Sequence, residues 1–304
     1  MALVSVILPV YNGARFIKES LDSVLVQTFH DYEVICVDDG STDASLAILH
    51  EYRPNITVLR QTNAGQGAAR NAGVRHASGR YVAFIDQDDR WYPWKLEQQV
   101  RTIEREPEAV LVHCNSDRMD SEGRVVQRGA TLAEYQRAMN SPLGRLLNEG
   151  LILPSAMFVR RDAFERVGGF DPELRGYEDF DLCARLKQEG RFVFLDEPGM
   201  CYRVHPGGSS RAGHTVVRSR ERFLKNMMKL YGADEAKRRI LDMLLAECYS
   251  DWGMDAMRAK NFREAQTMLL RSLQCNPTKF RTYSRFFRSL LSGLFTSKGE
   301  PFHA

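Results

Sequence analysis

The first half of the chain alternates short apolar runs with segments whose apolar residues recur at helical spacing. The apolar runs predict strands, and the amphipathic segments between them predict helices. Because the strands are continuously apolar, they indicate an α/β fold with a mostly parallel central sheet that helices flank on both faces. The predicted strands are Val4–Val10, Tyr32–Val37, Ile56–Leu59, Tyr81–Ile85 and Ala109–His113, and the predicted helices are Phe16–Val26, Ala44–Tyr52, Ala68–Ala77 and Trp94–Glu106.

The pattern changes in the second half. Asp120–Gly123 is typical of a turn between short strands, and Arg191–Leu195 and Met200–Val204 are two further strand-like segments. From about Thr215 onward the chain consists of long predicted helices, so we expect an α/β domain over residues 1–214 and a C-terminal helical region over 215–304. Eight residues of this region are spaced as in a single tetratricopeptide-like hairpin: Ala246, Tyr249, Gly253, Phe262, Ala265, Leu269, Leu273 and Pro277.

Composition and charge narrow the class of protein. The chain is 43% hydrophobic with a net charge of +3, which is ordinary for a globular protein and too weak to argue for a nucleic-acid partner. Its six cysteines include no CxxC pair, and they are predicted to be reduced core thiols. No apolar stretch reaches the roughly 18 residues of a membrane span, and the N-terminus resembles a buried strand rather than a signal peptide. We therefore expect a cytoplasmic protein.

Two acidic motifs follow predicted strands. Asp38 and Asp39 stand side by side after the second strand, where a turn explains one polar residue but not two like charges. Asp86, Asp88 and Asp89 follow the Tyr81–Ile85 strand. A solvated acidic loop is the plain alternative. Three acids at the carboxyl end of a strand are better explained by a bound Mn²⁺ or Mg²⁺, which are hard ions that take carboxylate oxygens.

Three other motifs each have a structural and a functional interpretation. Arg70 follows a Gly65-Gln66-Gly67 segment that could approach phosphate, or it could form an internal salt bridge. Glu178 and Asp179 begin a predicted helix, where acids are ordinary, but one of them could be a general base. His205 precedes a Pro-Gly-Gly turn, and it is either structural or a ligand for a metal or a diphosphate.

Taken in order, these motifs resemble the family-2 glycosyltransferases, which are inverting enzymes of the GT-A (nucleotide-diphospho-sugar transferase) fold. The resemblance covers residues 3–210 and fades after about residue 215. It rests on Ser5–Asn12, Ser23–Thr28, Asp38–Asp43, Asn63–Gly73, Asp86–Asp89, Trp91 with Lys95, Leu96 and Gln99, Glu178–Asp179, and Tyr202–Arg203 with His205.

The resemblance implies a role for each matching residue. Asp179 matches the catalytic base, and Glu178 is its neighbour on the acceptor side. Asp88 or Asp89 would bind the metal on the donor diphosphate, with His205 as a further contact. The residues that would hold the donor nucleotide are Pro9, Tyr11, Asp39, Arg70 and Asp86.

The implied enzyme is a hexosyl- or N-acetylhexosaminyl-transferase that moves a sugar from a nucleotide-diphosphate donor, expected to be a UDP-sugar, to a hydroxyl of a glycan or lipid-linked acceptor. Biosynthesis of a bacterial cell-envelope polysaccharide would fit this activity. Two other classes remain open. A sugar-nucleotide nucleotidyltransferase would release pyrophosphate, but the Pro9–Gly13 segment lacks the basic phosphate loop it normally needs. A non-catalytic glycan-assembly module would bind donor without turnover, although this chain keeps every acid.

The C-terminal stretch from Lys279 to Phe295 combines basic and apolar residues and contains no acid. On a helix its apolar residues form one stripe: Tyr283, Phe286, Phe287, Leu290, Leu291 and Leu294. Two interpretations are open. The stripe packs on the hairpin as its last helix, or the helix lies on the inner face of the cytoplasmic membrane as a reversible peripheral contact.

Overall fold

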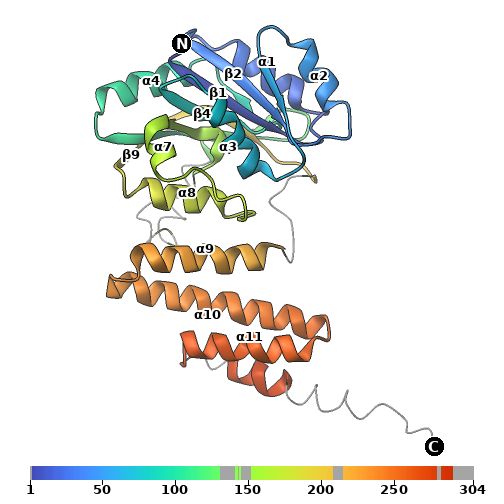
Figure 1. Ribbon diagram of the computed structural model, residues 1–304, viewed down its shortest axis with the longest axis vertical. Coiled ribbons are helices and arrows are strands. Elements are labelled where there is room, and N and C mark those ends of the chain that lie inside the picture. Colours follow the sequence, from blue (N-terminus) through green and yellow to red (C-terminus); the bar gives the residue numbers. More distant parts are fainter. Residues whose placement is uncertain are drawn as a thin grey trace, which may run out of the picture. The chain divides into compact units, whose positions relative to one another are not determined.

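The computed structural model describes residues 2–130, 141–142, 144, 152–207, 215–278 and 282–289. The chain divides into two compact units, Met1–Arg211 and Ala212–Ala304, each of which is described by itself (Figure 1).

The first unit is built on one mixed sheet. Its strands lie in the order β3-β2-β1-β4-β8-β6-β9-β5, and β7 pairs with β6. The strands are β1 Val4–Val10, β2 Tyr32–Asp38, β3 Thr57–Arg60, β4 Tyr81–Phe84, β5 Arg90–Trp91, β6 Ala109–Met119, β7 Val125–Gln127, β8 Met157–Arg160 and β9 Arg191–Arg203.

Most of these strands run in one direction. β1 pairs in parallel with β2 and β4, β2 pairs in parallel with β3, and β6 pairs in parallel with β9. β8 is antiparallel to both β4 and β6, so those two strands also share a direction. The carboxyl ends of β1, β2, β3, β4, β6 and β9 therefore meet at one edge of the sheet, as the sequence pattern predicts.

Helices cover both faces of the sheet, because each carries one apolar side toward it (Figure 1). One core cluster joins the sheet to helices α1 (Ile17–Leu25), α2 (Ser45–Glu51) and α4 (Lys95–Arg105). The other cluster joins the opposite face to α3 (Gln66–His76), α7 (Arg161–Arg166) and α8 (Glu178–Leu186). The short 3-10 helix η1 (Pro154–Ala156) leads into β8.

The structure tests two predicted details of the sheet. The predicted turn at Asp120–Gly123 is confirmed, since it joins β6 to β7. The strand-like segments Arg191–Leu195 and Met200–Val204 are confirmed as strand up to Arg203, but they belong to one element. β9 is a single strand of 13 residues that runs through Pro198, where its register with β6 shifts. Proline is tolerated there because a register irregularity spares it a ladder hydrogen bond.

The second unit consists of helices α9 (Thr215–Tyr231), α10 (Glu235–Arg258) and α11 (Phe262–Cys275), followed by a helical segment over residues 282–289. α10 and α11 form a close hairpin. A Cβ at Gly253 would lie 2.7 Å from the Leu269 side chain, so a larger residue would force the two helices apart. Among the described helices, none has the length and apolar character that crossing a membrane requires.

Candidate functional site

The site lies at the edge of the sheet where the parallel strands end. Tyr11 follows β1, Asp39 follows β2, Asp86 follows β4 and His205 follows β9. The beginnings of α3 and α8 add Arg70 and the Glu178–Asp179 pair. In open α/β sheets this edge is where ligands bind. The predicted site residues are thus gathered from loops far apart in the sequence.

The β1 loop exposes an aromatic ring on a fixed backbone. Tyr11 is 47% exposed, whereas Pro9 is buried within β1. The Gln87 side-chain amide accepts a bond from the Tyr11 N–H at 2.9 Å and donates to the Tyr11 carbonyl at 3.0 Å. A Cβ at Gly13 would lie 2.2 Å from the Gln87 Oε1, so only glycine allows this approach. The Tyr11 ring is therefore free to stack while its backbone is held.

Polar residues after β2 form hydrogen bonds with the backbone of the loop after β1. The Asn12 N–H donates to the Ser41 hydroxyl at 3.0 Å, and the Gly13 N–H donates to the Ser45 hydroxyl at 2.8 Å. The Asp43 carboxylate accepts from the Ala14 N–H at 3.1 Å. These side chains satisfy backbone donors of the β1 loop, so their role is to shape the site.

The two adjacent acids at the end of β2 have separate partners. The Asp39 carboxylate accepts from the Gln61 amide at 2.7 Å and from the backbone N–H groups of Ala64 and Gly65, both at 2.8 Å. Asp38 is buried, accepts from the Ser41 N–H at 3.2 Å and lies 3.5 Å from the Arg60 guanidinium. Asp39 thus holds the loop that leads into α3, a role that local sequence does not reveal.

Arg70 is buried among acids. Its guanidinium lies 2.5 Å from the Asp86 carboxylate and 5.2 Å from the centre of the Phe170 ring. Burial alone lowers the pKa of Arg70, but the carboxylates of Asp86, Asp179 and Glu178 outweigh burial and raise that pKa. The internal salt bridge, which was one of the two interpretations of Arg70, is present, and this cation orients the acids around it.

Glu178 and Asp179 begin α8 beside Arg70. The Glu178 Oε1 accepts from the Gln66 amide at 2.6 Å, and Gln66 also accepts from Arg70 at 3.3 Å. The Asp179 Oδ1 and the Glu178 Oε2 are buried without a hydrogen-bond partner among the described residues. Burial, followed by repulsion from Glu178, raises the pKa of Asp179 to about 8 despite the nearby Arg70 charge. A carboxyl group with this pKa is mainly protonated at neutral pH, and it becomes available to accept a proton as the pH rises toward 8.

Asp89, the third acid of the loop after β4, makes its hydrogen bonds within the protein. Asp89 is buried, and its two oxygens accept from the Ser155 hydroxyl at 2.5 Å and the Arg203 N–H at 3.0 Å. Ser155 also accepts from the Asp86 N–H at 2.9 Å. Burial, followed by the charges of Asp88 and Asp86, raises the pKa of Asp89 well above its usual range. Asp89 therefore ties the loop to η1 and β9.

Asp88 instead faces His205. The Asp88 Oδ2 lies 2.9 Å from the His205 Nε2, and both side chains keep some exposure, 26% and 12%. Burial, together with the Asp86 charge, raises the pKa of Asp88, and His205 opposes this effect. The His205 ring is held edge-on by Phe16, with ring centres 4.8 Å apart. The sequence therefore predicted the two partners but not their contact.

The positions of Asp88 and His205 show whether this site could hold a metal ion. A carboxylate and an imidazole at hydrogen-bond distance are both suitable ligands, so Asp88 and His205 fit a divalent cation. Within the described part of the chain, no group of three or more acidic, histidine or cysteine side chains could hold one. The remaining ligands would have to come from water or a bound phosphate, as is common for Mg²⁺.

No role was assigned from the sequence to four residues that hold the site together: Gln66, Gln87, Ser155 and Arg203. Arg203 is buried, and it donates to the Asp88 carbonyl at 2.7 Å and to the Glu19 carboxylate. A buried arginine that bonds a loop carbonyl fixes the direction of that loop. The Tyr-Arg pair at the end of β9 was the available signal for Arg203.

The Trp91–Gln99 motif stabilises the sheet behind the site. Lys95 is fully buried, with its ammonium 3.9 Å from the centre of the Trp91 ring and 2.7 Å from the Gln99 amide oxygen. Burial lowers the pKa of Lys95 to about 8. Gln99 donates in turn to the Ala156 carbonyl at 2.8 Å. The motif therefore joins α4 to η1, which carries Ser155.

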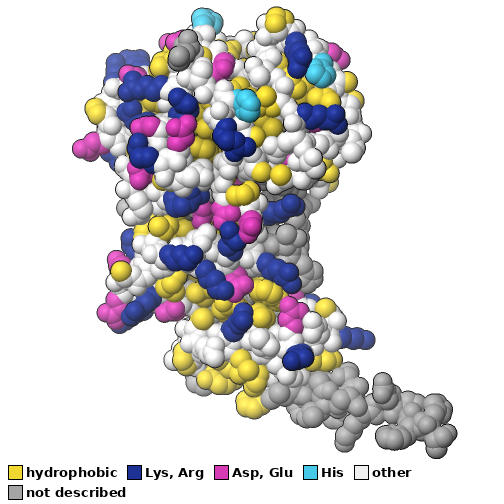
Figure 2. All heavy atoms as spheres, in the orientation of Figure 1, with side chains coloured by type: hydrophobic (Ala, Val, Ile, Leu, Met, Phe, Trp, Pro, Cys, Tyr) yellow, Lys and Arg dark blue, Asp and Glu magenta, His cyan; other side chains and the backbone are white. Residues whose placement is uncertain are grey.

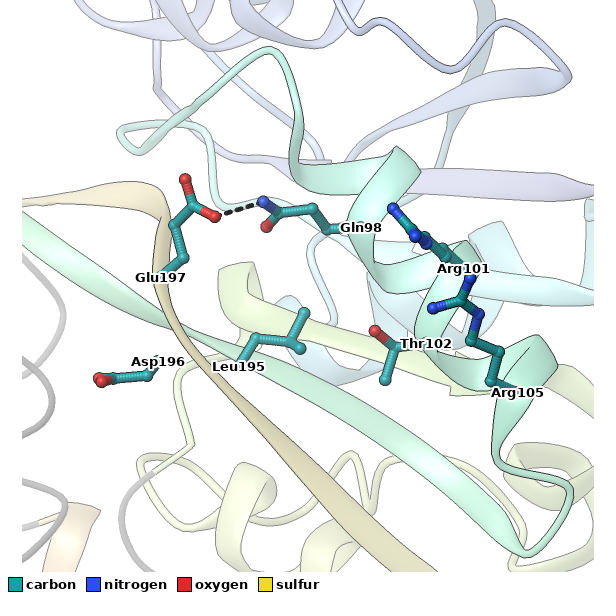
Figure 3. A pocket seen from close by; sticks show the side chains of 7 residues that line it. All are labelled: Gln98, Arg101, Thr102, Arg105, Leu195, Asp196 and Glu197. Carbon is teal, nitrogen blue, oxygen red and sulfur yellow. Dashed lines mark hydrogen bonds between the residues drawn. The ribbon is translucent and has the colours of Figure 1, made fainter.

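A separate hollow of about 230 Å³ lies between α4 and β9 (Figure 3). Arg101 and Arg105 project from α4 on one side, and Gln98 donates to Glu197 at 2.5 Å on the other. None of the predicted site residues lines it, so this hollow is distinct from the cluster at the carboxyl edge.

Comparison with known proteins places this fold and site in a family. The glycosyl transferase family 2 profile matches residues 5–168. An uncharacterized glycosyltransferase of Rickettsia prowazekii is 30% identical over 233 residues, which cover 75% of this chain and 73% of that protein.

Solved structures give the same fold at lower identity. Residues 1–349 of S. aureus TarS, in complex with UDP-GlcNAc, superpose with a TM-score of 0.71 at 20% identity, covering 100% of this chain and 93% of that one. The mannosyltransferase PcManGT of Pyrobaculum calidifontis, in complex with GDP-Man and Mn²⁺, gives a TM-score of 0.59 at 18% identity, covering 96% of this chain and 86% of that one. With the profile match over more than half of its length and the GT-A-like α/β architecture, the chain belongs to glycosyl transferase family 2 and is a glycosyltransferase.

Proposed function

We propose that the protein transfers a hexosyl or N-acetylhexosaminyl group from a UDP-sugar to an acceptor hydroxyl, with inversion at the anomeric carbon and Asp179 as the base. One observation carries this proposal. Asp179 has a buried oxygen without a hydrogen-bond partner among the described residues and a pKa of about 8, at the sheet edge where the strand-end loops converge.

The donor nucleotide would lie over the loops after β1 and β2. The exposed Tyr11 ring is available to stack on the base, with Pro9 supporting the strand beneath it. Asp39 would shape the base pocket, because its oxygens already accept from Gln61 and the 64–65 backbone. The complex of TarS with UDP-GlcNAc supports a uridine donor.

The diphosphate and the ribose would lie nearer the acidic loop. Asp86, which is paired with Arg70, would accept from the ribose. Asp88 and His205 would hold a Mn²⁺ or Mg²⁺ ion, whose chemistry would be to neutralise charge on the departing diphosphate. The complex of PcManGT with GDP-Man and Mn²⁺ supports a metal here. Because the contacts of Asp89 are internal, we propose Asp88 as the ligand of the two.

The reaction would be a single displacement. The oxygen of the acceptor hydroxyl bonds to the anomeric carbon while Asp179 accepts the proton of that hydroxyl. The bond from the anomeric carbon to the diphosphate oxygen breaks in the same step. Glu178, with its free Oε2, would position the acceptor. Arg70 keeps the two acids in place and offsets part of their repulsion. Attack from the face opposite the leaving group inverts the anomeric carbon, and no carboxylate nucleophile is needed, unlike in retaining hydrolases.

A donor screen tests this function. The purified chain should hydrolyse or transfer from UDP-sugars in preference to GDP-sugars, and NMR of the first-formed product should show inverted configuration. A retained configuration would contradict the single displacement. Pyrophosphate release from a nucleoside triphosphate and a sugar phosphate would identify a nucleotidyltransferase instead, and donor binding without turnover over many acceptors would indicate a binding module.

Asp179→Asn tests the base. The variant keeps the shape of the side chain but cannot accept the proton, so kcat should fall roughly 100-fold or more while donor affinity is unchanged. Steady-state kinetics and calorimetric titration with donor measure the two quantities. Asp162→Asn is the matched control, because Asp162 also lies in the first turn of a helix and pairs with Arg166 at 2.9 Å. Reduced donor affinity with kcat preserved would reassign Asp179 to substrate positioning.

The raised pKa of Asp179 predicts a pH-dependent stability. Between about pH 4 and pH 8 the native state holds a proton that the unfolded chain has lost, so the free energy of unfolding falls as pH rises through this window. Above about pH 8 this contribution is constant. Asp179→Asn stays neutral throughout, so its thermal midpoint should exceed that of the wild type by a margin that grows across the window. The same small margin at every pH would show that native Asp179 is ionised.

Asp88→Ala tests the metal site. Manganese should tighten UDP binding to the wild type, as measured by calorimetry with and without chelator. Asp88→Ala should lose this gain, whereas Asp89→Asn should keep it because the oxygens of Asp89 accept from Ser155 and Arg203. Asp31→Ala, an exposed acid just before β2, is the control. A full manganese effect in Asp88→Ala would remove that residue from the metal site.

A further inference from the structure

The C-terminal part of the chain, residues 265–299, is strongly basic. Between Glu264 and Glu300 there is no acidic residue, and six basic residues occur there: Arg271, Lys279, Arg281, Arg285, Arg288 and Lys298. The whole chain has a net charge of only +3, so the remainder is net acidic. A basic segment on an otherwise acidic protein is suited to an anionic surface.

Residues 282–289 form a helix that contacts the α10–α11 hairpin through small and polar residues. Thr282 and Ser289 are fully buried, seven residues apart on one side of the helix. Arg285, on the same side, donates to the Ser250 hydroxyl on α10 at 2.6 Å. Gln266 on α11 donates to the Ser289 carbonyl at 3.5 Å. The side that faces the hairpin is therefore mainly the polar one.

The other side of this helix exposes aromatic residues. Phe287 is 60% exposed and Tyr283 is 39% exposed, one helical turn apart, and Arg288 is exposed beside them. We call these three residues the aromatic–basic face. Leu270 on α11 is also 46% exposed, and Figure 2 shows hydrophobic side chains gathered over α11 and the short helix after it. Of the apolar stripe expected to pack on the hairpin, Tyr283 and Phe287 point away from it, so that interpretation is wrong for these two. Leu290, Leu291 and Leu294 lie outside the described residues.

We propose that the aromatic–basic face binds the surface of a membrane rich in anionic lipid. Aromatic rings beside arginine match the boundary between acyl chains and charged headgroups. The sequence after Ser289 continues with Leu290, Leu291, Leu294 and Phe295, so the apolar spacing extends beyond the described helix. The charge of the 265–299 stretch complements anionic headgroups. This proposal goes beyond the glycosyl transfer, and it does not depend on the identity of the donor.

Vesicle co-sedimentation with the full chain tests this binding. The protein should pellet with vesicles of phosphatidylcholine and phosphatidylglycerol at low salt, much less at high salt, and not with pure phosphatidylcholine. Phe287→Ser and Arg288→Glu should each lower the bound fraction at least about threefold while donor turnover is unchanged.

Two exposed residues of the first unit provide matched controls. Val126→Ser removes an apolar side chain that is 63% exposed, and Arg101→Glu reverses an exposed charge on α4. Both variants should bind vesicles as the wild type does. Equal losses in these controls would show that binding is not located at the aromatic–basic face.

Three further outcomes would overturn the proposal. One is the absence of vesicle binding by an active enzyme at low salt. Another is a gel shift of single-stranded RNA that Arg288→Glu abolishes, without vesicle binding. The third is a dimer in sedimentation velocity that Phe287→Ser dissociates, again without vesicle binding, which would assign the face to a second copy of the chain.

Discussion

The buried guanidinium of Arg70 is the constraint on which the site depends. A cation without solvent is stable only beside anions, and here it has Asp86 at 2.5 Å and Glu178 and Asp179 nearby. Since these residues belong to α3, the loop after β4 and the start of α8, one charge holds three elements together. Its Nε and Nη1, like Glu178 Oε2 and Asp179 Oδ1, have no hydrogen-bond partner among the described residues. Such groups are costly to bury.

Three acids that are nearly adjacent in the sequence differ in their hydrogen-bond partners. Asp86 is paired with Arg70, Asp88 faces His205, and Asp89 is enclosed by a hydroxyl and a backbone N–H. Their mutual repulsion still raises the pKa of Asp88 and of Asp89, but each acid has a different partner that opposes it. A single acidic loop can therefore combine a structural anchor with two groups that remain available to ligands.

Local sequence was sufficient for the main strands and helices of the first half of the chain, because the spacing of apolar residues predicts them. It was also sufficient for the edge of the sheet where the site lies, because that edge follows from the direction of the parallel strands. It could not identify partners that are distant in the chain. Ser155 bonds Asp89 from 66 residues away, and Arg203 bonds the Asp88 carbonyl from 115 residues away. The resemblance implies that Asp39 holds the donor nucleotide, and nothing in the sequence indicates that its carboxylate accepts from the backbone N–H groups of Ala64 and Gly65. The two strand-like segments of β9 have no visible link in the sequence, and only the register with β6 shows that they form one strand.

The helix over residues 282–289 shows a further limit of periodicity. An apolar stripe predicts that a helix is amphipathic, but it does not determine which side packs on the protein. Small hydroxyl residues can be buried when a nearby carbonyl accepts from them, as the Phe286 carbonyl does from Ser289 and the Ala246 carbonyl from Ser272. They also allow helices to approach closely. Ser289 is bonded in this way and Arg285 reaches Ser250, whereas the buried Thr282 hydroxyl has no partner among the described residues. With this side against the hairpin, the larger rings of Tyr283 and Phe287 lie on the outside, where an apolar phase or surface could cover them.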